Sequence, residues 1–296
     1  MEKTANTKIK TNDAIPYAKC VDVSSYQGNI DWHSAKDAGI HHAILKIIRK
    51  DLKPDTKFEQ NWKGCQNANV AVDGVYNYSY ATSVEKAKTD AKKVLSELNG
   101  RKCIVWLDLE DKCQQGLGPL IKDIINSYQD VILSAGYEFG IYTGPSFFNP
   151  FLKPYFPQIE CSNFWLARYY NSYRKMDLSV CPNERYNPKL ITGFDSIYAW
   201  QYTSSGQVPG ISGNVDLSVI YGNASDDYTG CMKGRVSNCT KLNLRKEPKV
   251  AANNIVSVLD VNDEVFLKEK INGWYKVATK NNLAGYVSGK YITILS

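Results

Sequence analysis

Hydrophobic positions in the first 220 residues form short apolar runs separated by stretches with helical periodicity. The apolar runs are rich in β-branched side chains, as expected of strands buried on both faces. The intervening stretches repeat apolar residues three and four positions apart, which is typical of amphipathic helices. The strand candidates are Val21–Val23, Ala43–Ile48, Val72–Tyr80, Cys103–Leu109, Phe139–Tyr142, Phe164–Ala167 and Ile197–Tyr202. The helix candidates are Trp32–Ala38, Phe58–Asn69, Ser83–Leu98 and Leu120–Ala135.

The order of these elements predicts the fold class. The third helix has clear end signals, because Ser83 stands at its N-cap and Asn99-Gly100 follows its last turn. Strands alternating with helices predict an α/β protein whose mostly parallel sheet closes into a barrel. In such barrels the reactive side chains gather at the C-terminal ends of the strands.

One strand candidate ends in a pair of acids. Cys103–Leu109 is followed at once by Glu110, so that Asp108 and Glu110 stand two residues apart. Strand side chains alternate between faces, so both acids should point the same way, with Cα atoms roughly 6–7 Å apart. Desolvated like charges repel and raise a pKa, and glycoside cleavage requires one protonated and one ionised acid. A solvated strand end followed by a loop explains the same spacing. Other segments of the sequence are needed to distinguish it from a catalytic acid pair.

Two other segments carry a similar pattern. Cys20-Val-Asp22-Val-Ser24-Ser25-Tyr26-Gln27-Gly28 lies near the start, and Trp200-Gln201-Tyr202 precedes Val215-Asp216 near residue 220. With Asp108-Leu-Glu110 between them, these segments resemble glycoside hydrolase family 25, the lysozymes (N-acetylmuramidases) of phages and bacteria. The resemblance covers roughly Tyr17 to Gly222 and implies an irregular, flattened β/α barrel. Ser218 departs from the family pattern, which often has Asn there, at a position where we expect no chemistry.

The resemblance also implies roles for four acids, all expected at C-terminal strand ends. Glu110 would be the general acid, and Asp108 would orient the 2-acetamido group of N-acetylmuramic acid and stabilise the cyclic intermediate. An inverting route, in which a carboxylate activates water, stays open. Asp22 and Asp216 would hydrogen-bond substrate, water or the other acids, although structural acids that cap backbone amides fit the same pattern. The candidate sugar-binding residues are Tyr78, Tyr142, Trp165, Tyr169 and Gln201.

The expected reaction is cleavage of the β-1,4 bond between N-acetylmuramic acid and N-acetylglucosamine in peptidoglycan glycan strands, without a cofactor. Two alternatives remain at this stage. The first is a chitin-type N-acetylglucosaminidase, which would use the same acid pair. The second is a non-catalytic wall-binding protein that has kept the barrel, and the intact Asp108 and Glu110 argue against it.

Composition argues against several other classes. The chain has eight cysteines but no Cys-x-x-Cys and only three histidines, which disfavours a zinc site. We expect the cysteines to be reduced thiols, because several lie inside apolar runs as small hydrophobes. No stretch approaches the ~20 apolar residues of a membrane span, and the N-terminus lacks an apolar signal region. The sequence therefore predicts a protein made in the cytosol that reaches the wall after holin-type release, as phage endolysins do.

The C-terminal part differs in pattern and charge. We expect a polar tail at residues 1–16, the family 25-like barrel at 17–222, a linker at 223–230 and a small all-β barrel at 231–296. Segments Leu242–Pro248, Asn272–Val277 and Gly285–Val287 resemble the bacterial SH3 family, a frequent wall-binding appendage. Residues 231–296 hold 11 Lys and Arg against 5 Asp and Glu, whereas the first 230 hold 25 of each. Such a cationic surface favours a polyanionic Gram-positive wall polymer, and no basic–aromatic motif indicates nucleic acid.

Overall fold

The computed structural model describes two parts of the chain. These are residues 18–221, except 160, 162, 171–173, 181 and 195, and residues 232–295, except 252–253 and 280–283. They belong to separate compact units, of which the first spans Ala18–Gly222. The expected tail at 1–16 and the expected linker at 223–230 lie outside the described residues.

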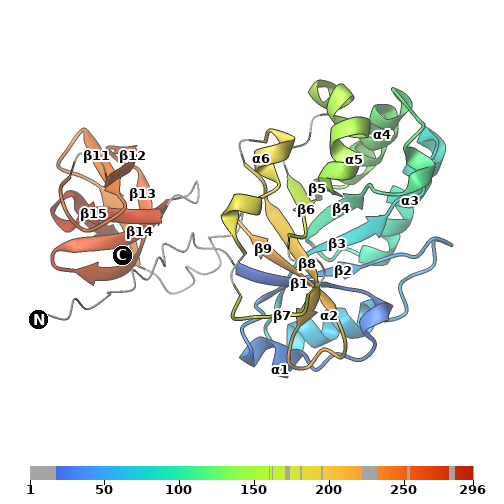
Figure 1. Cartoon of the computed structure of the whole chain (residues 1–296), viewed down its shortest axis with the longest axis horizontal. Coiled ribbons are helices and arrows are strands. Elements are labelled where there is room, and N and C mark those ends of the chain that lie inside the picture. The colour runs from blue at the N-terminus through green and yellow to red at the C-terminus, as the bar shows by residue number, and fades with distance from the viewer. Residues whose placement is uncertain are drawn as a thin grey trace, which may run out of the picture. The chain divides into compact units, whose positions relative to one another are not determined.

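Eight strands of the first unit close into a barrel (Figure 1). Six of them pair in parallel and in chain order, namely β1 (Ala18–Val23), β2 (His42–Lys46), β3 (Ala71–Tyr78), β4 (Ile104–Asp108), β5 (Glu138–Thr143) and β6 (Phe164–Ala167). Strand β8 (Ala199–Gln207) continues in parallel beside β6. Strand β9 (Val215–Ile220) then runs antiparallel between β8 and β1 and closes the ring. The predicted barrel is confirmed, and β9 is a strand that the sequence reading did not separate.

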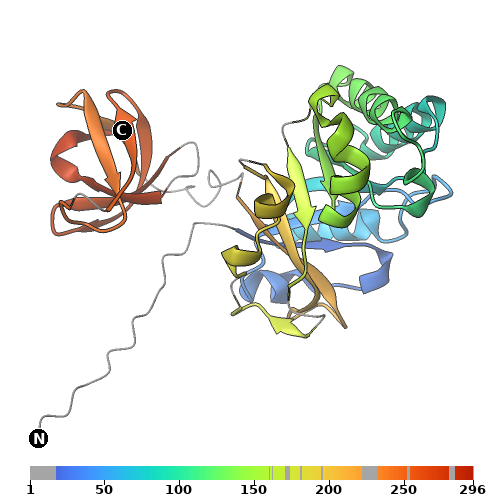
Figure 2. The ribbon, with the colours of Figure 1, turned by 45° about the horizontal axis from the view of Figure 1, so that its top comes forward.

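Helices cover the outside of the barrel (Figure 2). The four longer ones are α1 (Trp32–Asp37), α2 (Phe58–Asn67), α3 (Val84–Leu98) and α4 (Leu120–Ser134), as predicted to within two residues. Helix α2 packs on β2 and β3, α4 packs on β5, and α3 lies against α4. The Ser83 hydroxyl accepts the N–H of Lys86 at 3.3 Å, and Asn99 ends α3 with a left-handed φ of 47°, so both predicted end signals are confirmed.

Shorter elements connect these. They are β7 (Met176–Asp177) beside β8, helices α5 (Pro145–Phe147) and α6 (Lys189–Thr192), and helical turns at Ser25–Gln27, Lys112–Gln114, Phe148–Leu152, Lys153–Gln158 and Glu184–Tyr186. Among the helices in the described parts of the chain, none is long and apolar enough to cross a membrane.

Aromatic rings fill the interior of the barrel. Trp106 of β4 is fully buried, and its ring lies 5.8 Å from that of Trp165 and 5.2 Å from that of Tyr198. Gly74 and Gly140 on the two neighbouring strands make room for it, because a Cβ at either position would lie 2.4 or 2.3 Å from Trp106. The interior below the strand ends is therefore a packed core on which a site can be built.

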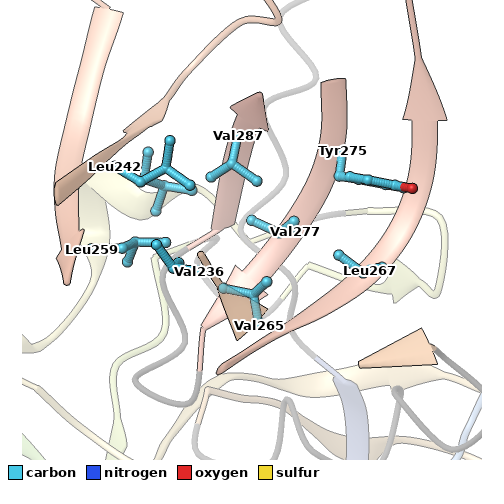
Figure 3. Close-up of a cluster of buried hydrophobic side chains, with 9 residues drawn as sticks. Val236, Leu242, Leu259, Val265, Leu267, Tyr275, Val277 and Val287 are labelled. Atoms are coloured by element: carbon cyan, nitrogen blue, oxygen red, sulfur yellow. The ribbon is translucent and has the colours of Figure 1, made fainter. Parts of the chain in front are cut away.

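The second unit is an all-β sheet of seven antiparallel strands. They are β10 (Met232–Val236), β11 (Lys241–Arg245), β12 (Ile255–Asp260), β13 (Glu264–Ile271), β14 (Trp274–Thr279), β15 (Ala284–Ser288) and β16 (Ile292–Leu295), with a helical turn at Gly289–Tyr291. Nine buried side chains form its own core, including Val236, Leu259 and Val277 (Figure 3). Asn272 and Gly273 both have positive φ, 47° and 82°, and form the predicted two-residue turn between β13 and β14.

We predict that Gly140→Ala destabilises the barrel by about 1–3 kcal/mol, because the added methyl group overlaps the buried ring of Trp106. The measurement is urea denaturation followed by tryptophan fluorescence. Gly116→Ala is the control, since its added Cβ meets nothing within 4 Å. Equal stability of the two variants would contradict the proposed fit between glycine and tryptophan.

Candidate active site

Side-chain alternation brings the predicted acids to one rim of the barrel. Cys20 and Trp106 point into the barrel core, so Asp22 and Asp108, two residues further along β1 and β4, point inward as well. Asp216 is also inward, four residues before the core residue Ile220 on β9. The expectation that all four acids follow C-terminal strand ends is wrong for Asp216. Because β9 is antiparallel, its first residues reach the rim at which β1 and β4 end.

Asp22 and Asp216 are direct partners across the β1–β9 ladder. Side chains in this relation have Cβ atoms about 4.5–5.5 Å apart. Burial and the charge of Asp216 raise the pKa of Asp22 well above its usual range. Burial and the charge of Glu110 raise the pKa of Asp216 to about 7. The pair therefore keeps a proton at pH values where an isolated aspartate is ionised.

Asp108 and Glu110 differ in their exposure. Asp108 ends β4 with 4% of its surface exposed, and its Oδ1 is buried without a hydrogen-bond partner among the described residues. Burial, and then the charge of Glu110, raise the pKa of Asp108 well above its usual range. Glu110 stands two residues beyond the strand and is exposed, yet partial desolvation and the charge of Asp111 raise its pKa too. One acid is thus accessible and the other is enclosed.

Lys46 is a cation near these acids that the sequence reading missed. It ends β2, and its Nζ lies 5.6 Å and 5.8 Å from the ring centroids of Tyr76 and Tyr78. Its charge lowers the pKa of both Asp108 and Glu110, against the effect of burial. The signal was present in the sequence, because a lysine interrupts the otherwise apolar run Ala43–Ile48.

Three of the predicted sugar-binding residues form one hydrogen-bonded group with Asp22. The hydroxyls of Tyr142 and Tyr169 both donate to Gln201 Oε1, at 2.7 Å and 2.6 Å. Gln201 Nε2 donates to Asp22 Oδ2 at 2.9 Å. Gln201 is 3% exposed and Tyr142 is 6% exposed, so both lie beneath the rim rather than on it.

The other two candidates are placed differently. Tyr78 is partly exposed, and its hydroxyl donates to Asp111 Oδ2 at 3.3 Å. Trp165 is 1% exposed and donates its indole N–H to Ser218 Oγ at 3.0 Å, inside the barrel core. The structure therefore does not bring Trp165 to the surface of the site. Ser218, which departs from the family pattern, supports Trp165 from β9.

The turn after β1 is held by Asp55, a second residue that the sequence reading missed. Gln27 Oε1 accepts the N–H of Ser24 at 2.9 Å, and the buried Asp55 accepts the N–H of Ser25 at 3.1 Å. At the tip of this braced turn, Tyr26 is 85% exposed. The ordered backbone thus presents an aromatic ring to solvent directly after the strand that enters the site.

The chemistry available is that of acids with raised pKa values beside a lysine and several tyrosines. Within the described ranges, no three His, Cys, Asp or Glu side chains are arranged to hold a metal ion. An accessible acid that stays partly protonated can donate a proton, and an enclosed carboxylate can stabilise positive charge. Both abilities are needed for acid-catalysed cleavage of a glycosidic bond.

Comparisons with known proteins agree with this chemistry. The family model "Glycosyl hydrolases family 25" matches residues 21–211, and the model "Bacterial SH3 domain" matches residues 240–293. Autolytic lysozyme of Clostridium acetobutylicum is 24% identical over 201 residues, which are 67% of this chain and 54% of that protein. Lysozyme M1 of Streptomyces globisporus is 25% identical over 224 residues, 69% and 68% of the two chains.

Among solved structures, the modular autolysin LytC from Streptococcus pneumoniae, in complex with a synthetic peptidoglycan ligand, superposes with a TM-score of 0.56 at 26% identity. The match covers 69% of this chain and 47% of LytC. The chain therefore spans about half the length of LytC and of the clostridial lysozyme.

We predict that Asp216→Asn stabilises the protein at about pH 8 but not at about pH 4. The folded pKa of Asp216 is raised to about 7 from an ordinary value of 3.8, so its ionisation removes stability as pH rises through this window. An amide carries no charge and escapes this loss. The measurement is the melting temperature across the pH range, with Asn replacing the exposed Asp37 of α1 as the control. A difference from wild type that does not vary with pH would contradict the assignment.

Proposed function

Since this chain belongs to glycosyl hydrolase family 25, we propose that it hydrolyses peptidoglycan at the β-1,4 bond between N-acetylmuramic acid and N-acetylglucosamine. The observation that carries the proposal is the acid pair at the end of β4. Glu110 is accessible, Asp108 is enclosed, and the pKa of each is raised. Support comes from the two relatives named as lysozymes and from the peptidoglycan ligand in the LytC structure.

Glu110 is the general acid in this proposal. Its exposed position lets it reach the glycosidic oxygen, and its raised pKa keeps the side chain protonated to higher pH than an ordinary glutamate. The proton passes from Glu110 to the departing oxygen as the bond to the anomeric carbon breaks. Lys46 opposes the rise in pKa and keeps the acid able to give up its proton.

Asp108 acts on the 2-acetamido group of the muramic acid. The acetamido oxygen attacks the anomeric carbon as the glycosidic bond breaks, while the acetamido N–H donates to Asp108 Oδ1, which has no partner among the described residues. This step uses the ionised form of Asp108, which the charge of Lys46 favours against burial and the charge of Glu110. The ionised carboxylate then stabilises the cyclic cation. Water then attacks the anomeric carbon and reopens the acetamido ring, and its proton passes to the ionised Glu110. Asp108 is not the nucleophile, because it stands beside Glu110 at one strand end and two-carboxylate enzymes place their acids across the sugar. A covalent sugar adduct on Asp108, or inverted product, would exclude this route.

The remaining site residues hold the sugar and the acids in place. Asp22 and Asp216 hydrogen-bond substrate, water or the neighbouring acids from the opposite side of the rim. Tyr78 offers a partly exposed ring to the apolar face of a sugar. Trp165 packs under Tyr142, with ring centroids 4.3 Å apart, and supports it from the core rather than touching the sugar.

We further infer that the C-terminal unit holds the enzyme on a Gram-positive type of wall. Two observations support an anionic wall polymer as the ligand. The unit matches the bacterial SH3 family, and residues 231–296 contain 11 basic and 5 acidic residues. Phage origin and release through a holin-type pore stay predictions of the sequence.

Digestion of purified walls, followed by reducing-sugar and mass analysis, tests the proposed reaction. We expect fragments whose new reducing ends are N-acetylmuramic acid. Activity on chitin but not on walls would select the N-acetylglucosaminidase alternative. Binding to walls without new reducing ends would select the non-catalytic one.

We predict that Glu110→Gln lowers the rate of wall digestion by about 10²–10⁴-fold, because the amide keeps the shape of the side chain but cannot donate the proton. Turbidity loss of a wall suspension is the measurement. Glu138→Gln is the matched control, since Glu138 is exposed at the start of β5, at the other end of the barrel. A Glu110→Gln variant that keeps more than about a tenth of wild-type activity would remove Glu110 from this role.

We predict that removing the C-terminal unit weakens attachment to walls while hydrolysis is retained. Residues 1–225 and the full chain, both carrying Glu110→Gln so that the wall survives, are compared by sedimentation with purified walls. The same two chains with Glu110 intact are compared by the release of new reducing ends. If charge dominates, binding of the full chain falls steeply with salt, because exposed charges are screened within about 8–10 Å at physiological ionic strength.

Binding that resists salt would point instead to specific pockets, for which the partly exposed Trp274 and Tyr286 are candidates. Equal sedimentation of the full chain and of residues 1–225 at every salt concentration would defeat the targeting idea. The excess charge would then serve solubility alone.

A further inference from the structure

We propose that Gln201 is a positioning residue whose side-chain amide is locked by the hydroxyls of Tyr142 and Tyr169, so that its N–H stays on Asp22. The lock, rather than contact with the sugar, is the reason that these three side chains meet beneath the rim. The inference deepens the proposed muramidase function and rests on it for its kinetic test.

The hydrogen bonds allow one orientation of the amide. Gln201 Oε1 has two acceptor positions, and the hydroxyls of Tyr142 and Tyr169 occupy both, at 2.7 Å and 2.6 Å. Gln201 Nε2 donates to Asp22 Oδ2 at 2.9 Å. In the reversed orientation the amide oxygen would face Asp22 Oδ2, whereas the two hydroxyls could still accept from the NH₂ group. Asp22 therefore selects the orientation of the amide, and the two tyrosines anchor its oxygen so that the N–H stays within reach of Asp22.

Burial indicates that Gln201 and Tyr142 serve the protein rather than the ligand. They are 3% and 6% exposed, which leaves little surface for a sugar, whereas Tyr169 is half-buried. The ring of Tyr142 lies 4.3 Å from that of Trp165, whose indole N–H is fixed by Ser218. A continuous set of contacts thus runs from the barrel core to the carboxylate.

The hydrogen bond from Gln201 reaches one of two neighbouring carboxylates, those of Asp22 and Asp216. Gln201 on β8 reaches past β9, which carries Asp216, to Asp22 on β1. Two carboxylates that are direct cross-strand partners repel when ionised, and a fixed donor on one of them opposes that repulsion. The N–H of Gln201 also lowers the pKa of Asp22, against burial and the charge of Asp216. Without the lock, Asp22 would be free to turn and harder to ionise.

The test uses full-length variants with phenylalanine at Tyr142 and Tyr169, singly and together, in wild type and in Gln201→Met. Steady-state kinetics on soluble peptidoglycan fragments give kcat and KM. Either hydroxyl alone still orients the amide, so we expect each single variant to change kcat less than about threefold. The double variant should lose about 10- to 100-fold in kcat with KM nearly unchanged, as for one lost hydrogen bond to a charged group. In Gln201→Met the same double change should have no further effect.

Opposite outcomes would overturn the proposal. The first such outcome is a loss of kcat in the double variant that equals the product of the losses in the two single variants. The second is a loss of kcat that persists in Gln201→Met, and the third is a raised KM. Each would mean that the hydroxyls act on the substrate and not through Gln201. Tyr128→Phe is the control for loss of a buried tyrosine hydroxyl, because Tyr128 lies in α4 outside the barrel. Melting temperatures identify any variant that fails to fold. The single variants in wild type and in Gln201→Met then carry the test, because an effect on kcat that persists in Gln201→Met overturns the proposal.

A second measurement does not depend on activity. Carbon-13 NMR titration of the Asp22 carboxyl should give a higher pKa in the double variant than in wild type, because the N–H that favours the ionised form is no longer held in place. An unchanged pKa of Asp22 would overturn the lock. Failure of the proposed function itself would be seen separately, as a wild-type protein that folds but releases no new reducing ends from walls.

Discussion

Antiparallel pairing of β9 with β1 is the constraint on which the site depends. It makes Asp216 the direct cross-strand partner of Asp22 inside the barrel, so two acids share one face of a ladder. Such an arrangement is unfavourable when both are ionised. The surrounding residues offset it, through the donor from Gln201 and through raised pKa values that keep a proton on the pair. The site is therefore held in a state that an isolated strand pair would avoid.

The barrel core supplies the rigidity that this state requires. Trp106 fills the interior against Gly74 and Gly140. Trp165 contacts both Trp106 and Tyr142, so the packing is continuous from the interior to Tyr142. A close-packed interior transmits position from one side chain to the next, because it has few alternative arrangements. Burial that stabilises the fold is also what raises the pKa of Asp108 and Asp22. Stability and reactivity thus have a common physical source in this barrel.

The candidate active site and the net positive charge of the protein lie in different units of the chain. In the first 230 residues basic and acidic residues balance at 25 each, and four of the acids, Asp22, Asp108, Glu110 and Asp216, lie at the rim of the barrel. Residues 231–296 carry the whole net charge of +6 and have a separate apolar core. Each unit therefore has its own buried core and its own charge balance.

The sequence by itself determined the elements and most of the barrel. Apolar runs, the Ser83 and Asn99-Gly100 signals and the Asn272-Gly273 turn are local features, and local sterics and hydrogen bonds are sufficient to fix them. The spacing of Asp108 and Glu110 was also visible in the sequence, and strand alternation accounts for the inward direction of Asp108, whereas Glu110 lies beyond the end of β4. The carboxyl ends of parallel strands then brought Asp22 to the same rim.

Only the tertiary structure decided the rest. The direction of β9, and with it the pairing of Asp216 with Asp22, depends on a long-range ladder that no local pattern encodes. Whether Trp165 faces a sugar or the core depends on its depth along the barrel, and an apolar run looks the same at either depth. The bonds from Tyr142 and Tyr169 to Gln201 join β5, the segment after β6 and β8, so the role of each side chain is set by neighbours that are distant in the chain. Sequence patterns give the periodicity of hydrophobic positions and the order of helices and strands. The hydrogen-bond partners and the burial of a side chain are fixed only when the barrel closes.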